Sequence, residues 1–196
     1  MVHRDLHTGN VLCKYFRSSN MCISNLGLCG EADNMDVTKI YGIIPYVAPE
    51  VLRGKPYTKA ADIYSFGMIM YFVATGRQPF SDRAHNEFLV LGICNGERPK
   101  IDEKEAPECY INLMKRCWDS NPDNRPNSEE ISKSIRKFYE EVGQFEEAEE
   151  YRINNLSSIE NIQLAIHPQA SYTSRLLNSF TEILQKLESD YLEHAI

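Results

Sequence analysis

The pattern of apolar and polar positions predicts a largely helical chain with a small β element near its start. Two short apolar runs, Val11-Leu12-Cys13 and Met21-Cys22-Ile23, flank a polar stretch, which is typical of two strands joined by a turn. Residues 60–75 are apolar on every side, as expected for a buried helix that ends at Gly76. This stretch is too short to span a bilayer.

Start and stop signals predict further helices along the rest of the chain. Residues 84–95 end near Gly96, and residues 107–118 begin at a proline. Asn127-Ser128-Glu129-Glu130 resembles a capping box that begins a helix reaching about Glu141. An α+β protein with mainly helical content is therefore expected.

Composition and charge narrow the class of protein. The chain has 42% apolar and 25% charged residues, and its net charge of -7 is unevenly placed. Residues 1–139 carry a balance of +1, whereas residues 140–196 carry -8. Without a basic patch, neither a nucleic acid nor a membrane is predicted as a partner. Six cysteines without a C-x-x-C pair, and no signal peptide, predict reduced thiols in a cytoplasmic protein.

Five short motifs follow one another in order, and these are His3-Arg4-Asp5-Leu6-His7-Thr8-Gly9-Asn10, Asn25-Leu26-Gly27, Ala48-Pro49-Glu50, Asp62-Ile63-Tyr64-Ser65-Phe66-Gly67 and Cys117-Trp118-Asp119-Ser120-Asn121-Pro122-Asp123-Asn124-Arg125-Pro126. They resemble the H-R-D-L-x-x-x-N, D-F-G, A-P-E, D-x-[WY]-S-F-G and C-W-x-x-x-P-x-x-R-P motifs of eukaryotic protein kinases. The last motif resembles that of tyrosine kinases and of the tyrosine-kinase-like Ser/Thr group. Their common order is far more specific than any one match.

The resemblance covers residues 1–140 and implies the mainly α-helical C-terminal lobe of a protein-kinase-like fold. The Gly-rich loop, the strand Lys and the helix Glu that precede this lobe in the family are missing, so the N-terminal lobe is expected to be absent. Met1 is then either an internal methionine of a longer protein or part of a truncated gene copy. In the family, the helix that precedes the catalytic loop packs on the helix that matches residues 60–75. Because that upstream helix is not among the 196 residues, part of residues 60–75 is expected to be exposed.

Residues 141–196 lie beyond the resemblance. They are expected to form an acidic helical extension, a linker and an amphipathic helix over residues 175–193. Docking of this helix on the lobe, or binding of a partner, is favoured, and a short coiled coil stays open because the pattern covers only two to three heptads.

The resemblance also implies roles for individual residues. Asp5 matches the catalytic base beside the attacking hydroxyl, and Asn10 matches a ligand of the Mg²⁺ that accompanies ATP. Arg4 matches the residue that binds a phosphorylated activation segment. This segment lies between Asn25 and Glu50, and Thr38 and Tyr41 are its candidate phosphorylation sites. An unmodified surface loop is the alternative for that segment.

Three further residues are implied to hold the lobe together. Glu50 and Arg125 match a buried ion pair that ties the activation segment to the last helices of the lobe. Asp62 matches the residue that anchors the backbone of the catalytic loop from the buried helix. These residues predict that the lobe fold is kept even if the chemistry is not.

Asn25 is the most consequential departure from the family, because an Asp at this position holds Mg²⁺ against the phosphates and a carboxamide offers only a neutral oxygen. His7 replaces the Lys of Ser/Thr kinases, Ile43 replaces a Thr, and Leu26 replaces the Phe of D-F-G. We expect impaired phosphate transfer and weak binding of ATP and Mg²⁺ by this chain alone.

Three functional interpretations follow. The first is a pseudokinase or signalling scaffold that binds a protein substrate or signalling partner. The second is an active, divergent kinase of the tyrosine-kinase-like group once an upstream lobe is present, and the third is a non-functional truncated copy. The preference for Ser/Thr or Tyr stays open.

Overall fold

The structure is a computed structural model, and it describes residues 1–13, 21–30, 39–140, 142–155 and 166–193. The candidate site Thr38 lies outside the described residues. The α-helices are α1 (Pro49–Leu52), α2 (Lys59–Thr75), α3 (Glu87–Cys94), α4 (Glu108–Cys117), α5 (Ser128–Phe138), α6 (Val142–Asn154) and α8 (Asn178–Glu193). The short 3-10 helices are η1 (Thr8–Asn10), η2 (Leu26–Leu28), η3 (Ile44–Tyr46) and η4 (Pro122–Asn124). The strands are β1 (Val11–Cys13), β2 (Met21–Ile23), β3 (Tyr41–Gly42) and β4 (Arg175–Leu176).

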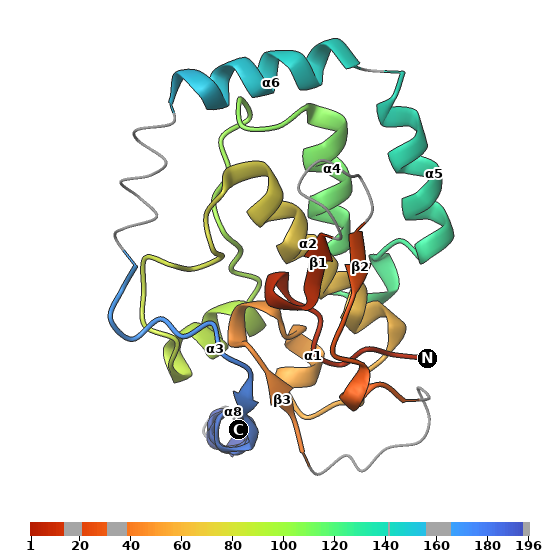
Figure 1. Cartoon of the computed structure of the whole chain (residues 1–196). Coiled ribbons are helices and arrows are strands. Elements are labelled where there is room, and N and C mark those ends of the chain that lie inside the picture. Colours follow the sequence, from red (N-terminus) through yellow and green to blue (C-terminus); the bar gives the residue numbers. More distant parts are fainter. Residues whose placement is uncertain (14–20, 31–38, 141, 156–165, 194–196) are drawn as a thin grey trace.

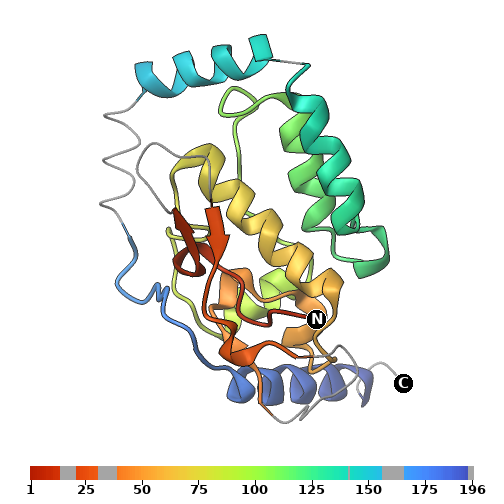
Figure 2. The same ribbon diagram turned by 45° about the vertical axis from the view of Figure 1, so that its right-hand side comes forward.

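Helix α2 lies at the centre of the molecule, between the N-terminal strands and α4 (Figures 1 and 2). It begins where the Thr58 side chain accepts a hydrogen bond from the backbone of Ala61, and it ends as predicted at Gly76, which has a φ of 67°. A Cβ at Gly67 would lie 3.0 Å from Cβ of Cys117, so this glycine permits the close approach of α2 and α4.

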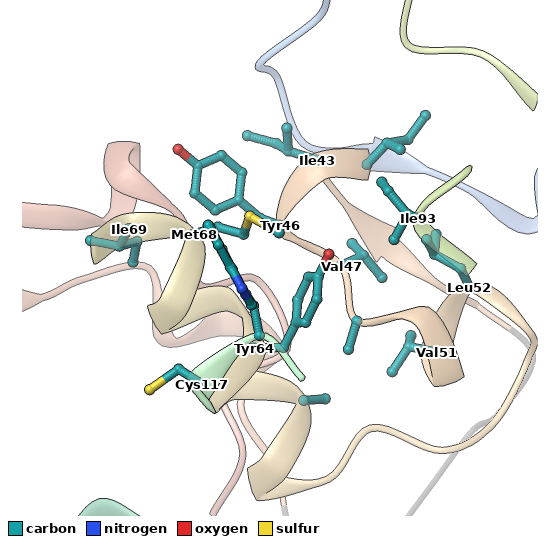
Figure 3. Close-up of a cluster of buried hydrophobic side chains, with 14 of the residues drawn as sticks. Ile43, Tyr46, Val47, Val51, Leu52, Tyr64, Met68, Ile69, Ile93 and Cys117 are labelled. Carbon is teal, nitrogen blue, oxygen red and sulfur yellow. The ribbon is translucent and has the colours of Figure 1, made fainter. Parts of the chain in front are cut away.

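The core forms where the segment between β3 and α1 packs on α2. Figure 3 shows Tyr46 and Val47 close to Tyr64 and Met68 of α2. The side chain of Ile43 belongs to the same buried cluster, with 3% of its surface exposed. Residues 43–47, near the end of the activation segment, are therefore part of the hydrophobic core. Burial of their apolar side chains stabilises this segment and its packing on α2.

One face of α2 is open to solvent, so the prediction that this helix is buried on every side is wrong. Val73 is 60% exposed and Phe72 is half-buried. They border an apolar groove of about 470 Å³, which is lined by Leu6, Thr8, Val11, Met21, Cys22, Ile23, Phe66, Ile69, Met70, Phe72, Val73, Tyr110, Ile135 and Phe138. The partial exposure expected from the missing upstream helix is found here.

The two predicted N-terminal strands form an antiparallel pair, with Val11 opposite Ile23. A second pair was not predicted. Strand β3 of the activation segment pairs antiparallel with β4, so that Gly42 lies opposite Arg175. The predicted helix over residues 175–193 therefore begins later, at Asn178, whose side-chain oxygen accepts a hydrogen bond from the backbone N–H of Ile40 at 2.9 Å.

The remaining helices deviate only at their ends. Helix α3 begins after Asn86, whose side-chain oxygen accepts hydrogen bonds from the backbone N–H groups of Phe88 and Leu89, and not at residue 84. The capping box of Asn127 with Glu130 is present at the start of α5, and α5 ends at Phe138. Among the described residues, each helix is too short or too polar to cross a membrane.

Helix α8 packs against α3 at the end of the molecule opposite α6 (Figures 1 and 2). Leu177 just before α8, and Thr181 and Leu184 within it, are buried, with 0%, 7% and 2% of their surfaces exposed. A Cβ at Gly54, which has a φ of 84°, would lie 2.8 Å from Nε2 of Gln185 in α8. Of docking on the lobe, partner binding and a coiled coil, the structure shows α8 docked on the lobe.

Glu50 and Arg125 form a buried, bidentate ion pair. The two guanidinium nitrogens of Arg125 donate to the two carboxylate oxygens of Glu50 at 2.7 and 2.8 Å. Arg125 also donates to the backbone carbonyls of Ala60 and Asp119 at 2.9 and 2.8 Å. One guanidinium thus joins α1 to the start of α2 and to the end of α4.

Glu50→Gln is expected to lower the free energy of unfolding by about 3–5 kcal/mol, because it leaves the buried charge of Arg125 without its counter-ion. Urea unfolding measures the change. Glu129→Gln is the matched control, since Glu129 pairs with Lys133 on an exposed helix face and its loss is expected to cost about 0.5 kcal/mol. Equal losses in the two variants would contradict the structural role of the pair.

Candidate active site

Asp62 of α2 holds the chain segment that carries the H-R-D motif. Its carboxylate accepts hydrogen bonds from the backbone N–H groups of His3 at 2.7 Å and Arg4 at 3.1 Å. Burial raises the pKa of Asp62, and the two N–H donors offset part of that rise. Arg4 has a φ of 71°, a left-handed conformation that is unusual for a residue with a side chain. The segment is thus fixed to the centre of the lobe.

The catalytic-loop residues come together around Asp5. Asn10 donates from Nδ2 to the backbone carbonyl of Asp5 at 2.7 Å and lies 3.5 Å from its Oδ2. His7 begins η1 by accepting a hydrogen bond from the backbone of Gly9, and its Nε2 lies 3.0 Å from Asn10 Nδ2 and 3.7 Å from Asp5 Oδ2. Asp5 and Asn10 are both buried. The structure brings these two predicted residues together.

The electrostatic environment keeps the Asp5 carboxyl ionised. Burial raises its pKa, but a hydrogen bond with His7, the charge of protonated His7 and a hydrogen bond with Ser174 lower it, and the net pKa lies below its ordinary value of 3.8. Among the described residues, Asp5 Oδ1 lacks a hydrogen-bond partner of ordinary geometry. A buried carboxylate with one open oxygen can orient a hydroxyl group for attack on a phosphate.

Ser24, the residue before Asn25, is hydrogen-bonded to Asn10. Both the backbone N–H and the hydroxyl of Ser24 donate to the backbone carbonyl of Asn10, at 2.8 and 3.1 Å. Asn25 itself is exposed and has a left-handed φ of 61° at the start of η2. These two hydrogen bonds connect the segment that carries Asn25 to the segment that carries Asn10.

The residues present fit a Mg²⁺ ion poorly. Asn10 uses its amide nitrogen on Asp5, which leaves one neutral oxygen for a cation, and Asn25 offers another neutral oxygen. Mg²⁺ prefers carboxylate oxygens, and the described residues contain no group of three His, Cys, Asp or Glu side chains that could hold a metal. The donor set lacks the negative charge that metal-assisted phosphate transfer requires.

Gly42 of the activation segment lies against Asp5. Gly42 has a φ of 149°, and a Cβ there would lie 2.6 Å from Val47 Cγ2 and 3.9 Å from Asp5 Oδ1, so only glycine fits. The candidate site Tyr41 is half-buried in β3, and its backbone carbonyl accepts a hydrogen bond from the Tyr57 hydroxyl at 2.6 Å. The guanidinium of Arg4 lies beside Gly30, at the other end of the segment.

Ser174 is the site residue that sequence reasoning missed. Its hydroxyl forms a hydrogen bond that lowers the pKa of the Asp5 carboxyl, although 168 residues lie between the two in the chain. A single serine in a short extended stretch carries no periodic or motif signal. It lies beside Asp5 because β4 pairs with β3, and a pairing between such distant two-residue strands cannot be derived from local sequence.

Comparison with known proteins decides the family. The model of the protein tyrosine and serine/threonine kinase family matches residues 1–135, which include Asp5, Asn25, Glu50, Asp62 and Arg125. The chain belongs to the protein kinase family. The helical lobe, with its few short strands, is the fold that this family uses for its C-terminal half.

Curated protein kinases are similar to this chain over the same region. The serine/threonine-protein kinase PkaA of Streptomyces coelicolor is 32% identical over 148 residues, which are 73% of this chain and 26% of that protein. The dual specificity protein kinase shkD of Dictyostelium discoideum is 34% identical over 132 residues, 67% of this chain and 18% of that protein. The human receptor-interacting serine/threonine-protein kinase 1 is 30% identical over 176 residues, 80% of this chain and 26% of that protein. The chain spans about a quarter or less of these relatives.

His7→Ala is expected to raise the pKa of Asp5, because the variant removes the hydrogen bond and the charge of His7. Since the folded-state pKa of Asp5 lies below 3.8, the carboxylate contributes stability that is present above that pH and lost as the pH falls through the folded-state pKa. The variant should have less of this stability, and its loss should be complete at a higher pH. Carbon NMR of the Asp5 carboxyl, with urea unfolding between pH 2 and 6, measures both effects.

Lys59→Ala serves as the control for this experiment, because it removes a positive charge from the exposed start of α2. Its Asp5 titration is expected to match that of the unaltered chain. A titration of Asp5 that is the same with and without His7 would show that the contact does not set the charge state of the site.

Proposed function

We propose that residues 1–140 form the substrate-binding lobe of a protein kinase whose phosphate transfer is impaired, and that the chain acts as a pseudokinase or signalling scaffold in the cytoplasm. The observation that carries this proposal is Asn25. It matches the position at which the family has a metal-binding Asp, and its side chain is neutral, as is that of Asn10. The metal-dependent half of the site is therefore deficient.

The acceptor half of the site supports the binding role. Asp5 is buried, ionised and held by Asn10 and His7, and its segment is anchored by Asp62. The ion pair of Glu50 and Arg125 keeps the activation segment folded on the lobe. A protein segment that carries a hydroxyl group would find a rigid, prepared site at Asp5.

Regulation by phosphate belongs to the same proposal. Arg4 would clamp a phosphate on Thr38 or Tyr41, since a guanidinium suits bidentate phosphate contacts. Residues 141–196 would act as an extension of the lobe that controls access to it. The proposed domain boundary near residue 140 lies just after the region matched by the family model, residues 1–135.

An active, divergent kinase of the tyrosine-kinase-like Ser/Thr group is the second candidate. The contact between Asp5 and Asn10 favours it, because the catalytic loop keeps a geometry suited to phosphate transfer. In that case, ATP and Mg²⁺ would be held jointly with an upstream lobe, and an alternative ligand would replace the carboxylate that Asn25 lacks.

Asn25→Asp separates the two candidates. If the missing carboxylate limits metal binding, the variant should bind Mg²⁺-ATP at least about tenfold more tightly than the unaltered chain in isothermal titration calorimetry. Asn154→Asp adds the same charge to an exposed position on α6 and is expected to leave the affinity unchanged. If the unaltered chain binds Mg²⁺-ATP as tightly as the Asn25→Asp variant does, and also transfers phosphate to a peptide, the active enzyme would be favoured.

A further inference from the structure

Residues 166–177, which lead into α8, run along the lobe (Figure 1). The backbone N–H of His167 donates to the carbonyl of Ser81 at 2.9 Å, and the N–H of His85 donates to the carbonyl of Gln169 at 3.0 Å. Further along, the N–H of Leu177 donates to the carbonyl of Ile40 at 2.7 Å. The hydrogen bonds are spread over eleven residues, so the whole segment is bound along the lobe.

Side chains fix the middle of this segment around His85. The N–H of Ser171 donates to His85 Nδ1 at 3.1 Å, and the ring of Tyr172 meets the His85 ring edge-on at 4.9 Å. The Tyr172 hydroxyl donates to the carbonyl of Pro79 at 3.0 Å. Arg175 donates to the carbonyl of His85 at 2.9 Å. These contacts set the direction and the register of the segment.

Strand addition then brings the segment to the activation segment. Arg175 and Leu176 pair antiparallel with Gly42 and Tyr41. Addition of a strand to an exposed edge is a common way in which a folded domain binds an extended peptide, because the backbone gives affinity and alternate side chains give specificity. Leu177 is fully buried, whereas Leu176 is 48% exposed, so the two leucines face in different directions.

The same pairing places Ser174 at Asp5. Gly42, the partner of Arg175, approaches so closely that a Cβ on it would lie 3.9 Å from Asp5 Oδ1. Ser174 precedes Arg175, is half-buried, and has its hydroxyl within reach of the Asp5 carboxylate. A hydroxyl beside the catalytic carboxylate is the arrangement that a phosphate acceptor needs.

We propose that residues 171–177 mimic the lobe's protein substrate, with Ser174 in the place of the acceptor hydroxyl. The inference rests on the proposed role of this lobe in binding protein segments at Asp5. It also names the substrate class, which is an extended peptide with a Ser or Thr acceptor. An aromatic residue stands two positions before the acceptor, as Tyr172 does, and an arginine and a buried leucine follow at one and three positions after it, as Arg175 and Leu177 do.

The attachment of this segment to the lobe gives it an advantage over free substrates. A segment joined by a short chain acts at an effective concentration on the order of millimolar. A protein that binds the same site in the micromolar range is therefore excluded for most of the time. The tail controls access to Asp5 without any chemical change.

The test uses a fluorescein-labelled peptide with the sequence of residues 167–180, and its binding to the full chain is measured by fluorescence anisotropy. Leu177→Asp in the chain places a charge at a fully buried position and should release the tail, so the peptide is expected to bind at least about tenfold more tightly than to the unaltered chain. Ile153→Asp is the matched control, because it places the same charge at a position on α6 that is 53% exposed and outside residues 171–177, so the affinity should not change.

Thermal unfolding shows whether the Leu177→Asp chain is folded. If it is not, Tyr172→Ala takes its place, with Tyr139→Ala as its control because Tyr139 is 80% exposed. Tyr172→Ala removes the anchor at His85 and is expected to raise peptide affinity in the same direction. A folded released variant that binds the peptide no better than its control would overturn the proposal.

The position of Ser174 is tested in the peptide, where folding is not at issue. Measured on the released chain, Ser174→Glu in the peptide brings a carboxylate against Asp5 and should weaken binding at least about tenfold, whereas Thr173→Glu at an exposed position should change it less than about twofold. Equal effects would overturn the assignment of Ser174. Neither readout uses ATP or phosphate transfer, so a failure of the proposed function in the Asn25→Asp experiment would be distinct from a failure here.

Discussion

The hydrogen bonds from the backbone of His3 and Arg4 to the carboxylate of Asp62 are the interaction on which the site depends. They attach the start of the chain to the central helix, although 58 and 59 residues separate the partners. Arg4 adopts its left-handed backbone within this attachment, and Asp5 follows directly. A buried carboxylate is costly unless donors satisfy it, so the same contacts that stabilise Asp62 also fix the direction of Asp5.

Fold and acceptor site share their residues in the remainder of the lobe as well. The segment from Ile43 to Glu50 packs on α2 as part of the core, and its far end is held by Arg125. Gly42, at the near end, lies against Asp5. Asn25 is exposed and lies outside the core, so the identity of this side chain has little effect on the stability of this half.

Local signals in the sequence were sufficient for features that depend on neighbouring residues. The strands around residues 11–13 and 21–23, the end of α2 at Gly76 and the capping box at Asn127 were all predicted. Partial exposure of residues 60–75 was expected as well, but its place at Val73 was not, since a uniformly apolar helix does not show which side chains lack a partner. Ser174 and the pairing of β3 with β4 depend on contacts between distant parts of the chain, for which no periodic pattern exists.

The pairing of β4 with β3 has a consequence for the solubility of the protein. Strand β4 pairs with β3 and satisfies the backbone groups along its edge. An uncovered edge strand is a template for any passing chain, including a second copy of the same protein. The tail thus protects the lobe from edge-to-edge self-association while it is bound. Release of β4 from β3 would expose this edge again. The lobe would then be protected from self-association only if another polypeptide paired with β3.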